Sequence, residues 1–212
     1  GVDEASSIAT EAFLKTIIHT NEYPLTKLDG TNATEMAKVL ENSYRAMNIA
    51  FMVEWSRFAE EAGVNIYEVV NAIRMRDTHS NMMFPGIGVG GYCLTKDPLL
   101  ASWARTRLFD AIKGLSQSEQ GVRINDQMPL FAFDFLEQQL GLRGLKGFKV
   151  LLLGVSYRGD VGDTRYSPVE MFYRLLIGAE CEVHVHDYFV DYWSECGLKV
   201  ETNLEVALSG AF

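Results

Sequence analysis

The chain has 212 residues, a formal net charge of −9 and 48% hydrophobic residues. This length allows one large domain or two small ones with proper hydrophobic cores. The acidic balance argues against a nucleic-acid partner, because neutralising phosphates requires a basic face. The printed sequence shows no apolar run of the roughly 20 residues that span a bilayer, and no secretory signal opens it.

The first two-thirds of the chain has the apolar spacing of helices. Helices are expected at residues 5–20, from the TNATE segment (31–35, capped by Thr31 or Asn32) to 62, and at 66–74, 98–113 and 117–140. The second of these contains no proline or glycine, and Gly63 follows it as a stop signal. The last is expected to be interrupted or restarted near Pro129. So many apolar helices would suit a helical core that is shared between two subunits.

The character of the sequence changes at Gly141, where an α/β pattern begins. The run Val150–Leu153 predicts a strand that is buried on both faces. Ser167 as N-cap, Pro168 as first helical residue and Glu170 three positions after the cap predict a capping box. The helix that starts there is expected to end at Gly178.

Beyond this helix, the alternating segment 181–187 predicts a second strand, followed by a short third strand and the start of another helix. This order is the opening half of a doubly wound sheet. The predicted fold class is therefore α/β overall, with an all-α domain followed by an incomplete Rossmann-like domain. Because two or three strands make a poor domain alone, the sequence is expected to be a fragment of a longer protein.

Three cysteines, Cys93, Cys181 and Cys196, form no disulfide framework, and this odd count predicts reduced thiols and a cytoplasmic location. Neither they nor the four histidines have the paired spacing of a zinc site. His184 and His186 would share one face of a strand, which can hold a metal ion. Without a third ligand nearby, a surface pair is the favoured interpretation, and no metal site is predicted.

The segment FPGIGVGGYCLTKDP, residues 84–98, carries the strongest chemical signal. Its glycines let the main chain approach a ligand closely, with N–H groups free to point inward. Cys93, placed just after them, can attack a carbonyl carbon. Lys96 would favour the thiolate, and Asp97 could orient or deprotonate a water. A flexible linker with a chance cysteine is the alternative, and the ordered pattern disfavours it. A dinucleotide-binding turn or a P-loop does not fit the neighbouring residues.

A second constellation lies on the long predicted helix. Lys38 and Asn42 are four residues apart and therefore neighbours on one face. An ammonium beside an amide offers two donors to a negatively charged oxygen. From the spacing alone, a solvated helix face is the favoured interpretation.

The third constellation is YRGDVGDTRYSP, residues 157–168, between the first strand and the capped helix. Arg158 and Arg165 stand where α/β sheets bind phosphates through arginine forks and a helix N-terminus. Asp187, after the second strand, could accept a hydrogen bond from a ribose hydroxyl. An exposed loop with salt bridges explains this pattern equally well.

Together these stretches resemble the UDP-glucose/GDP-mannose dehydrogenase family, the nucleotide-sugar 6-dehydrogenases. The family's catalytic-cysteine loop is similar to residues 86–97, its central-helix motif to residues 35–51, and its D-x-R-x-S-P signature to residues 163–168. The resemblance implies an NAD-binding domain, a helical domain that forms a homodimer, and a UDP-binding domain. By this comparison, residues 1–142 are the helical domain, residues 143–212 are part of the UDP-binding domain, and the NAD-binding domain is missing.

The resemblance also implies a reaction, the oxidation of a UDP-sugar C6 alcohol to a carboxylate with two NAD⁺. Cys93 would form a thiohemiacetal and then a thioester, while Lys38 and Asn42 hold the C6 oxygen and Asp97 assists the water or the lysine. The implied binding residues are Gly88, Gly90, Gly91 and Arg158 for the substrate, and Lys96 and Arg165 near NAD or the diphosphate.

The sequence PGIGVGGYC, residues 85–93, is more similar to the branch of the family that acts on UDP-N-acetylhexosamines. UDP-glucose, UDP-N-acetylglucosamine, UDP-N-acetylmannosamine and GDP-mannose all remain open as substrates. Without the NAD-binding domain, the fragment is expected to be inactive. Two alternatives stay open: a relative of the β-hydroxyacid dehydrogenases, which need no nucleophilic cysteine, and a non-catalytic module for dimerisation and nucleotide binding.

Overall fold

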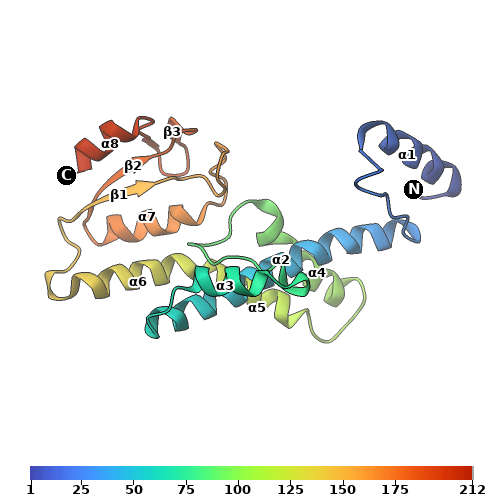
Figure 1. The fold of residues 1–212 in the computed structure, drawn as a ribbon, viewed down its shortest axis with the longest axis horizontal. Helices are drawn as coiled ribbons and strands as arrows, with labels where there is room; N and C mark the ends of the chain where they lie inside the picture. The colour runs from blue at the N-terminus through green and yellow to red at the C-terminus, as the bar shows by residue number, and fades with distance from the viewer. Residues whose placement is uncertain (212) are drawn as a thin grey trace. The chain divides into compact units, whose positions relative to one another are not determined.

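The computed structural model describes residues 1–211, and the side chains of all of these except residues 142 and 211. The chain forms two compact units, Gly1–Asn42 and Ser43–Phe212 (Figure 1). The second unit contains most of the helices and all of the strands that the structure describes.

The first unit contains helix α1 (Glu4–Ile17) and the beginning of α2 (Gly30–Glu61). The Asp3 carboxylate caps α1 by accepting a hydrogen bond from the Ser6 N–H at 2.7 Å, and the Ser6 hydroxyl in turn accepts one from the Asp3 N–H. Both helices were predicted. However, α1 ends three residues early, because Ile18 is already extended, and α2 begins at Gly30, just before the expected cap at Thr31 or Asn32.

In the second unit, the rest of α2 packs against the later helices through small residues. Ala46 and Ala50 are buried, and α5 approaches so closely that a Cβ on Gly121 would lie 3.1 Å from Met47. The Asn125 side chain of α5 donates to the Ala46 carbonyl at 2.9 Å. The other helices of this half are α3 (Ile66–Arg74), α4 (Tyr92–Arg107), α5 (Ser116–Asp126) and α6 (Met128–Leu140), with short 3-10 turns at Asp77–His79 and Gly141–Arg143.

Helix α4 corrects one prediction. The helix was expected at residues 98–113. In the structure α4 starts six residues earlier, at Tyr92, and contains Pro98 in its interior. Pro98 has no N–H for the Leu94 carbonyl, so the helix tolerates one missing bond. Cys93 therefore lies within the first turn of a helix rather than in a loop.

The last third of the chain is a β–α–β unit with a hairpin and a final helix. Strands β1 (Lys149–Leu153) and β2 (Glu182–His186) pair in parallel, with Leu151 opposite His184. Helix α7 (Pro168–Gly178) lies on one side of this sheet and α8 (Leu204–Ala211) on the other, and α6 packs beneath α7 (Figure 1). The hairpin is formed by β3 (Tyr192–Trp193) and β4 (Leu198–Lys199).

This arrangement confirms the α/β fold class. Its core is formed by residues from both strands, α7 and the hairpin, namely Leu152, Val155, Leu176, Val185 and Trp193. Ser167 caps α7 as predicted, with its hydroxyl accepting from the Val169 N–H. The capping box is not completed by Glu170, whose carboxylate instead accepts a charge-assisted bond from Arg174, one turn further along. Among residues 1–211, no helix combines the length and apolarity that crossing a membrane requires.

Candidate active site around Cys93

The glycine-rich segment that precedes Cys93 rests on the loop between β1 and α7. The Gly91 N–H donates to the Arg165 carbonyl at 3.2 Å, and the rings of Tyr92 and Tyr166 meet edge to face at 4.8 Å. A Cβ on Gly88 would lie 2.4 Å from Cβ of Pro168. The structure thus joins two of the three sequence constellations.

Cys93 is exposed and is the second residue of α4. The first N–H groups of a helix have no partner within the helix, and their dipoles favour a negative charge nearby. A thiolate is the reactive form of cysteine, so this position suits a nucleophile. Gly91 precedes the helix as its N-cap at φ 76°, a conformation that disfavours other residues.

Asp97 lies four residues after Cys93 on α4 and therefore on the same face of the helix. Its side chain is largely buried and accepts a hydrogen bond from Lys96 Nζ at 2.8 Å. This bond raises the pKa of the exposed Lys96 ammonium above its ordinary value. Lys96 thus stays charged close to Cys93 but already has a carboxylate partner.

Lys38 and Asn42 lie in the first unit, where Lys38 Nζ is 3.5 Å from Asn42 Oδ1 and 3.3 Å from the Glu41 carboxylate. The contact confirms that spacing of four places the two side chains on one face of α2. Asn42 is only 1% exposed, so the interpretation of a fully solvated face is wrong for it. Lys38 remains largely exposed.

The loop between β1 and α7 is held by Asp187, which follows β2. One carboxylate oxygen accepts from the N–H groups of Val155 and Ser156 at 2.9 and 3.2 Å, and the other accepts from the Phe189 N–H at 2.8 Å. Burial alone would raise the pKa of Asp187, but these hydrogen bonds outweigh it, so the pKa lies below its ordinary value. Both oxygens of Asp187 thus already accept backbone hydrogen bonds, and a bond to a ribose hydroxyl stays a prediction.

The two arginines of this loop differ. Arg165 donates to Asp163 through Nε at 2.9 Å and Nη2 at 2.7 Å, and its guanidinium lies 5.4 Å from the ring centroid of Tyr92. The paired guanidinium lowers the pKa of Asp163 to about 2. Arg158 is exposed, and no ion pair joins it to another of the described residues. Of the two, Arg158 is thus the more available for a phosphate group.

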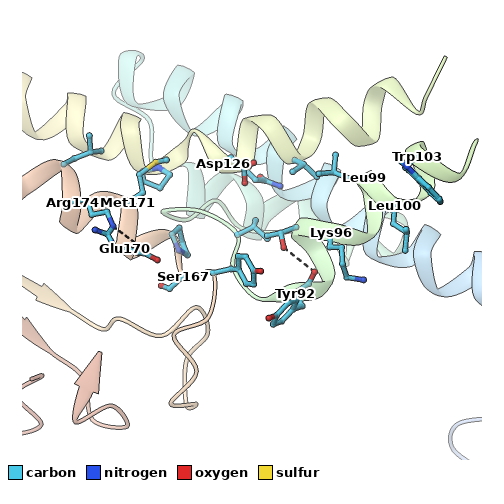
Figure 2. A pocket seen from close by; sticks show the side chains of 18 residues that line it. Tyr92, Lys96, Leu99, Leu100, Trp103, Asp126, Ser167, Glu170, Met171 and Arg174 are labelled. Atoms are coloured by element: carbon cyan, nitrogen blue, oxygen red, sulfur yellow. Dashed lines mark hydrogen bonds and ion pairs between the residues drawn. The ribbon is translucent and has the colours of Figure 1, made fainter. Parts of the chain in front are cut away.

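A pocket of about 1060 Å³ lies beside this contact, along α4, α5, the start of α6 and the first two turns of α7 (Figure 2). Leu99, Leu100 and Trp103 form one apolar wall, and Tyr92 and Lys96 connect it with the Cys93 segment. Cys93 itself is not among its lining residues. At the other end, Arg174 is paired with Glu170 at 2.8 Å, so the cations lining the pocket already have carboxylate partners.

The histidines and the other cysteines lie away from this chemistry. His186 is buried and its Nδ1 is 2.7 Å from the Glu201 carbonyl, so the expected surface pair with His184 is wrong for His186. Within the described part of the chain, no cluster of side chains suits a metal ion. All three cysteines are free, and burial raises the pKa of Cys181 and Cys196 above the ordinary thiol value.

Sequence reasoning missed two residues at this contact, Tyr157 and Tyr166. Tyr157 faces Gly90 and Gly91 directly, and Tyr166 has a left-handed backbone with φ 55°. Their aromatic rings at both ends of the segment 157–166 were a visible signal. These rings pack against the segment where α4 starts, at Tyr92. Because the helix was expected to start at residue 98, this contact was not predicted.

Two family models match the chain in sequence order. Residues 32–126 match the central domain of the UDP-glucose/GDP-mannose dehydrogenase family, and residues 151–211 match the UDP binding domain of the same family. A solved structure of the UDP-D-ManNAc dehydrogenase from Pyrococcus horikoshii is similar with a TM-score of 0.77 and 30% identity, over 100% of this chain and 47% of that chain.

Curated relatives point the same way. The UDP-N-acetyl-D-mannosamine dehydrogenase of Pyrococcus horikoshii is 38% identical over 166 residues, which is 76% of this chain and 38% of that protein. The enzyme of that name from Methanocaldococcus jannaschii is 33% identical over 195 residues, 89% of this chain and 41% of that protein. The chain thus spans about 40% of the length of these relatives. With two domain models of one family matched in order, the chain belongs to the UDP-glucose/GDP-mannose dehydrogenase family.

Proposed function

We propose that this chain is the part of an NAD-dependent nucleotide-sugar 6-dehydrogenase that carries the catalytic cysteine and part of the nucleotide site. The observation that carries the proposal is the placement of Cys93. It is exposed at the start of α4, and the glycine-rich segment before it contacts the D-x-R-x-S-P segment of the UDP binding domain. A nucleophile next to a nucleotide-binding loop is what covalent oxidation of a nucleotide sugar requires.

In the proposed reaction, the Cys93 sulfur adds to the C6 aldehyde of the sugar and gives a thiohemiacetal. Removal of the C6 hydride leaves a thioester, and water then releases the carboxylate and restores the thiol. Lys38 and Asn42, which contact each other on α2, donate to the C6 oxygen as it gains negative charge. Asp97, on the same helix face as Cys93, orients the water.

NAD⁺ is the proposed hydride acceptor in both oxidations, from the C6 alcohol to the aldehyde and from the thiohemiacetal to the thioester. The described residues do not fit a complete dinucleotide site. The turn after β1 lacks the G-x-G-x-x-G pattern, and both oxygens of Asp187 already accept hydrogen bonds from backbone N–H groups. Lys96 and Arg165, predicted to lie near NAD, each pair with an aspartate. We therefore assign NAD binding mainly to a domain outside residues 1–212, with these two cations at its margin.

The UDP moiety is proposed to bind along the loop between β1 and α7. Arg158 is exposed there, and the N-terminus of α7 begins with Ser167 and Pro168. A helix N-terminus and an arginine together favour a diphosphate. The contacts predicted for Gly88, Gly90 and Gly91 with the sugar remain part of the proposal.

A homodimer is proposed from the exposed aromatic face of α2. Phe51, Trp55 and Phe58 follow one another at helical spacing, are 48–59% exposed, and contact one another at centroid distances of 6.1 and 5.9 Å. Apolar patches of this kind mark interfaces between proteins. Trp55→Glu should convert the protein to a monomer in sedimentation experiments, while Phe109→Glu, in the exposed segment after α4, should leave the dimer intact. A Trp55→Glu dimer would contradict this assignment.

The proposed substrate is a UDP-N-acetylhexosamine, because the relatives reported above are UDP-N-acetyl-D-mannosamine dehydrogenases. Turnover by the complete enzyme should be compared for UDP-N-acetylmannosamine, UDP-N-acetylglucosamine, UDP-glucose and GDP-mannose. We expect the highest kcat/KM for the first. A preference for UDP-glucose or GDP-mannose would overturn the choice of branch but leave the reaction class in place.

The decisive test of the reaction is Cys93→Ser in the complete enzyme, read out as carboxylate formed from each nucleotide sugar. Loss of the nucleophile should abolish the carboxylate, whereas Cys196→Ser, a matched change at a partly buried thiol, should retain activity. Retained turnover in Cys93→Ser would remove the covalent role. In a non-catalytic nucleotide-binding module, both variants would be as inactive as the unaltered protein.

A further inference from the structure

The side chain of Tyr157 fills the space next to two of the glycines. A Cβ on Gly91 would lie 2.9, 3.0 and 3.3 Å from three ring atoms of Tyr157. A Cβ on Gly90 would lie 2.4 Å from Cβ of Tyr157. Gly90 has no positive φ, so lack of space, rather than an unusual backbone conformation, is what excludes a side chain there.

Tyr166 strengthens the same contact from the other end of the loop. Its left-handed backbone, at φ 55°, is strained for a bulky residue, which persists only where the surroundings enforce it. Its carbonyl oxygen would lie 2.6 Å from a Cβ on Gly90, and its ring packs on Tyr92, the first residue of α4. The strained residue thus lies where the two segments touch.

Tyr157 stands on a backbone that is itself held in place. Its N–H donates to the Asp163 carbonyl at 3.0 Å, and the two residues before it donate to the Asp187 carboxylate. On the opposite side of the contact, Gly91 is the N-cap of α4 and Cys93 follows two residues later. A short path of direct contacts therefore leads from Asp187 through Tyr157 to Cys93.

We propose that Tyr157 is a positioning residue for Cys93, because its ring fixes Gly90 and Gly91 and thereby the first turn of α4. The nucleotide-binding loop then determines where the sulfur lies. The role assigned to the sulfur rests on the proposed function, whereas the contact itself does not. Tyr157 touches no reacting atom in this account and acts only through the glycines.

The contact is tested with a double-mutant cycle of Tyr157→Ala and Gly91→Ala in the complete enzyme. The first readout is the rate at which iodoacetamide alkylates Cys93, resolved by peptide mass spectrometry with Cys196 as internal reference. Cys93 is already exposed, so a loosened first turn adds little access and removes ordered N–H groups. Each single variant should therefore slow alkylation about two- to fivefold, the size of a helix-terminus effect on a charge.

The double variant should be no slower than Gly91→Ala alone, because removing the ring makes room for the new Cβ, while the strain of alanine at φ 76° is common to both variants. Strictly multiplicative effects of the two changes, or an unchanged rate in Tyr157→Ala, would overturn the proposal. Tyr157→Phe keeps the ring and should react like the unaltered protein. Tyr192→Ala, an exposed tyrosine on the β3–β4 hairpin, is the matched control and should also have no effect. If Tyr157→Ala fails to fold, Tyr157→Leu takes its place in the cycle.

The second readout separates positioning from mere stability. In steady-state assays, Tyr157→Ala should lower kcat about tenfold or more, since displacing a reacting atom by about 1 Å can cost up to 10²-fold. KM should stay within about twofold, because Asp187 still braces the backbone next to Arg158. An increase in KM with unchanged kcat would overturn the positioning role. Activity that persists in Cys93→Ser would sink the proposed function, while the alkylation rates would still decide whether Tyr157 positions Cys93.

Discussion

The two segments that meet near Cys93 are held in place by different means. The loop between β1 and α7, residues 154–167, is fixed by hydrogen bonds, above all those to the buried Asp187 carboxylate. The glycine-rich segment is fixed by fit at Gly88, Gly90 and Gly91. Side chains or backbone of Tyr157, Tyr166 and Pro168 occupy the space that a Cβ would need there. A buried carboxylate can fix a loop through hydrogen bonds alone. Glycines fix a segment only where neighbouring atoms pack closely against them.

The largest expected effect on stability comes from the charged anchor. Asp187→Ala leaves the buried Val155 N–H and the part-buried N–H groups of Ser156 and Phe189 without their acceptor, at about 1–3 kcal/mol each. We expect the free energy of unfolding to fall by about 3 kcal/mol or more, measured by urea titration with tryptophan fluorescence. Asp191→Ala, at an exposed aspartate of the same domain, serves as the control and should stay within about 0.5 kcal/mol. Similar decreases in the free energy of unfolding in both variants would show that the Asp187 hydrogen bonds do not stabilise the fold.

The same anchor predicts an acid dependence. The folded-state pKa of Asp187 lies below its ordinary value of 3.8, so ionised Asp187 stabilises the fold fully above that value. The stabilisation is lost as the pH falls from 3.8 through the lower folded value. The stability difference between the unaltered protein and Asp187→Ala should therefore shrink below pH 3.8 and be constant above about pH 5. A difference that is independent of pH would contradict this.

The segment held by fit is tested by two alanine substitutions in the same loop. A Cβ on Gly90 collides with Tyr157 and Tyr166, so Gly90→Ala should destabilise the fold by about 1–3 kcal/mol. Gly86 has open space around its Cβ position and no positive φ, so Gly86→Ala should be neutral or stabilise by up to about 1 kcal/mol. Urea titration measures both. Equal changes in the free energy of unfolding would mean that the segment needs glycines for backbone flexibility and not for close packing.

The smallest expected effect concerns the exposed ion pair within the hydrogen-bonded loop. The Arg165 guanidinium lowers the pKa of Asp163 to about 2, so a carboxyl-carbon NMR titration should place its midpoint near that value. In Arg165→Gln the midpoint should rise towards 3.8, because the charged partner is gone. A midpoint near 3.8 in the unaltered protein would show that the pair is not formed in solution.

The sequence predicted the elements whose signals are local. Helix α3 has the predicted bounds, Ile66–Arg74, because Asn65 caps it and its apolar face is clear. The parallel pair of β1 and β2 followed from the apolar run and the alternating segment after Gly178. The start of α4 was missed because a proline in the interior of a helix looks like a helix start, and only the packed structure shows that the missing bond is tolerated.

The candidate site was predictable in its residue types but not in its contacts. Cys93, Lys96 and Asp97 are recognisable from their spacing, and Lys38 and Asn42 do share a helix face. That Asp187 would accept hydrogen bonds from three backbone N–H groups depends on a turn whose path the sequence does not encode locally. The contact between Tyr157 and Gly90 joins segments that are distant along the chain, and no local sequence pattern predicts it.

The most direct test of the account is to find where the sugar becomes attached during turnover. The complete enzyme would be mixed with NAD⁺ and the C6 aldehyde of its nucleotide sugar, quenched in acid within milliseconds and mapped by peptide mass spectrometry. The account predicts an acyl adduct on the peptide that contains Cys93, and a smaller yield of this adduct in Tyr157→Ala. An adduct on Cys196, or full turnover with no adduct on Cys93 at any quench time, would contradict it.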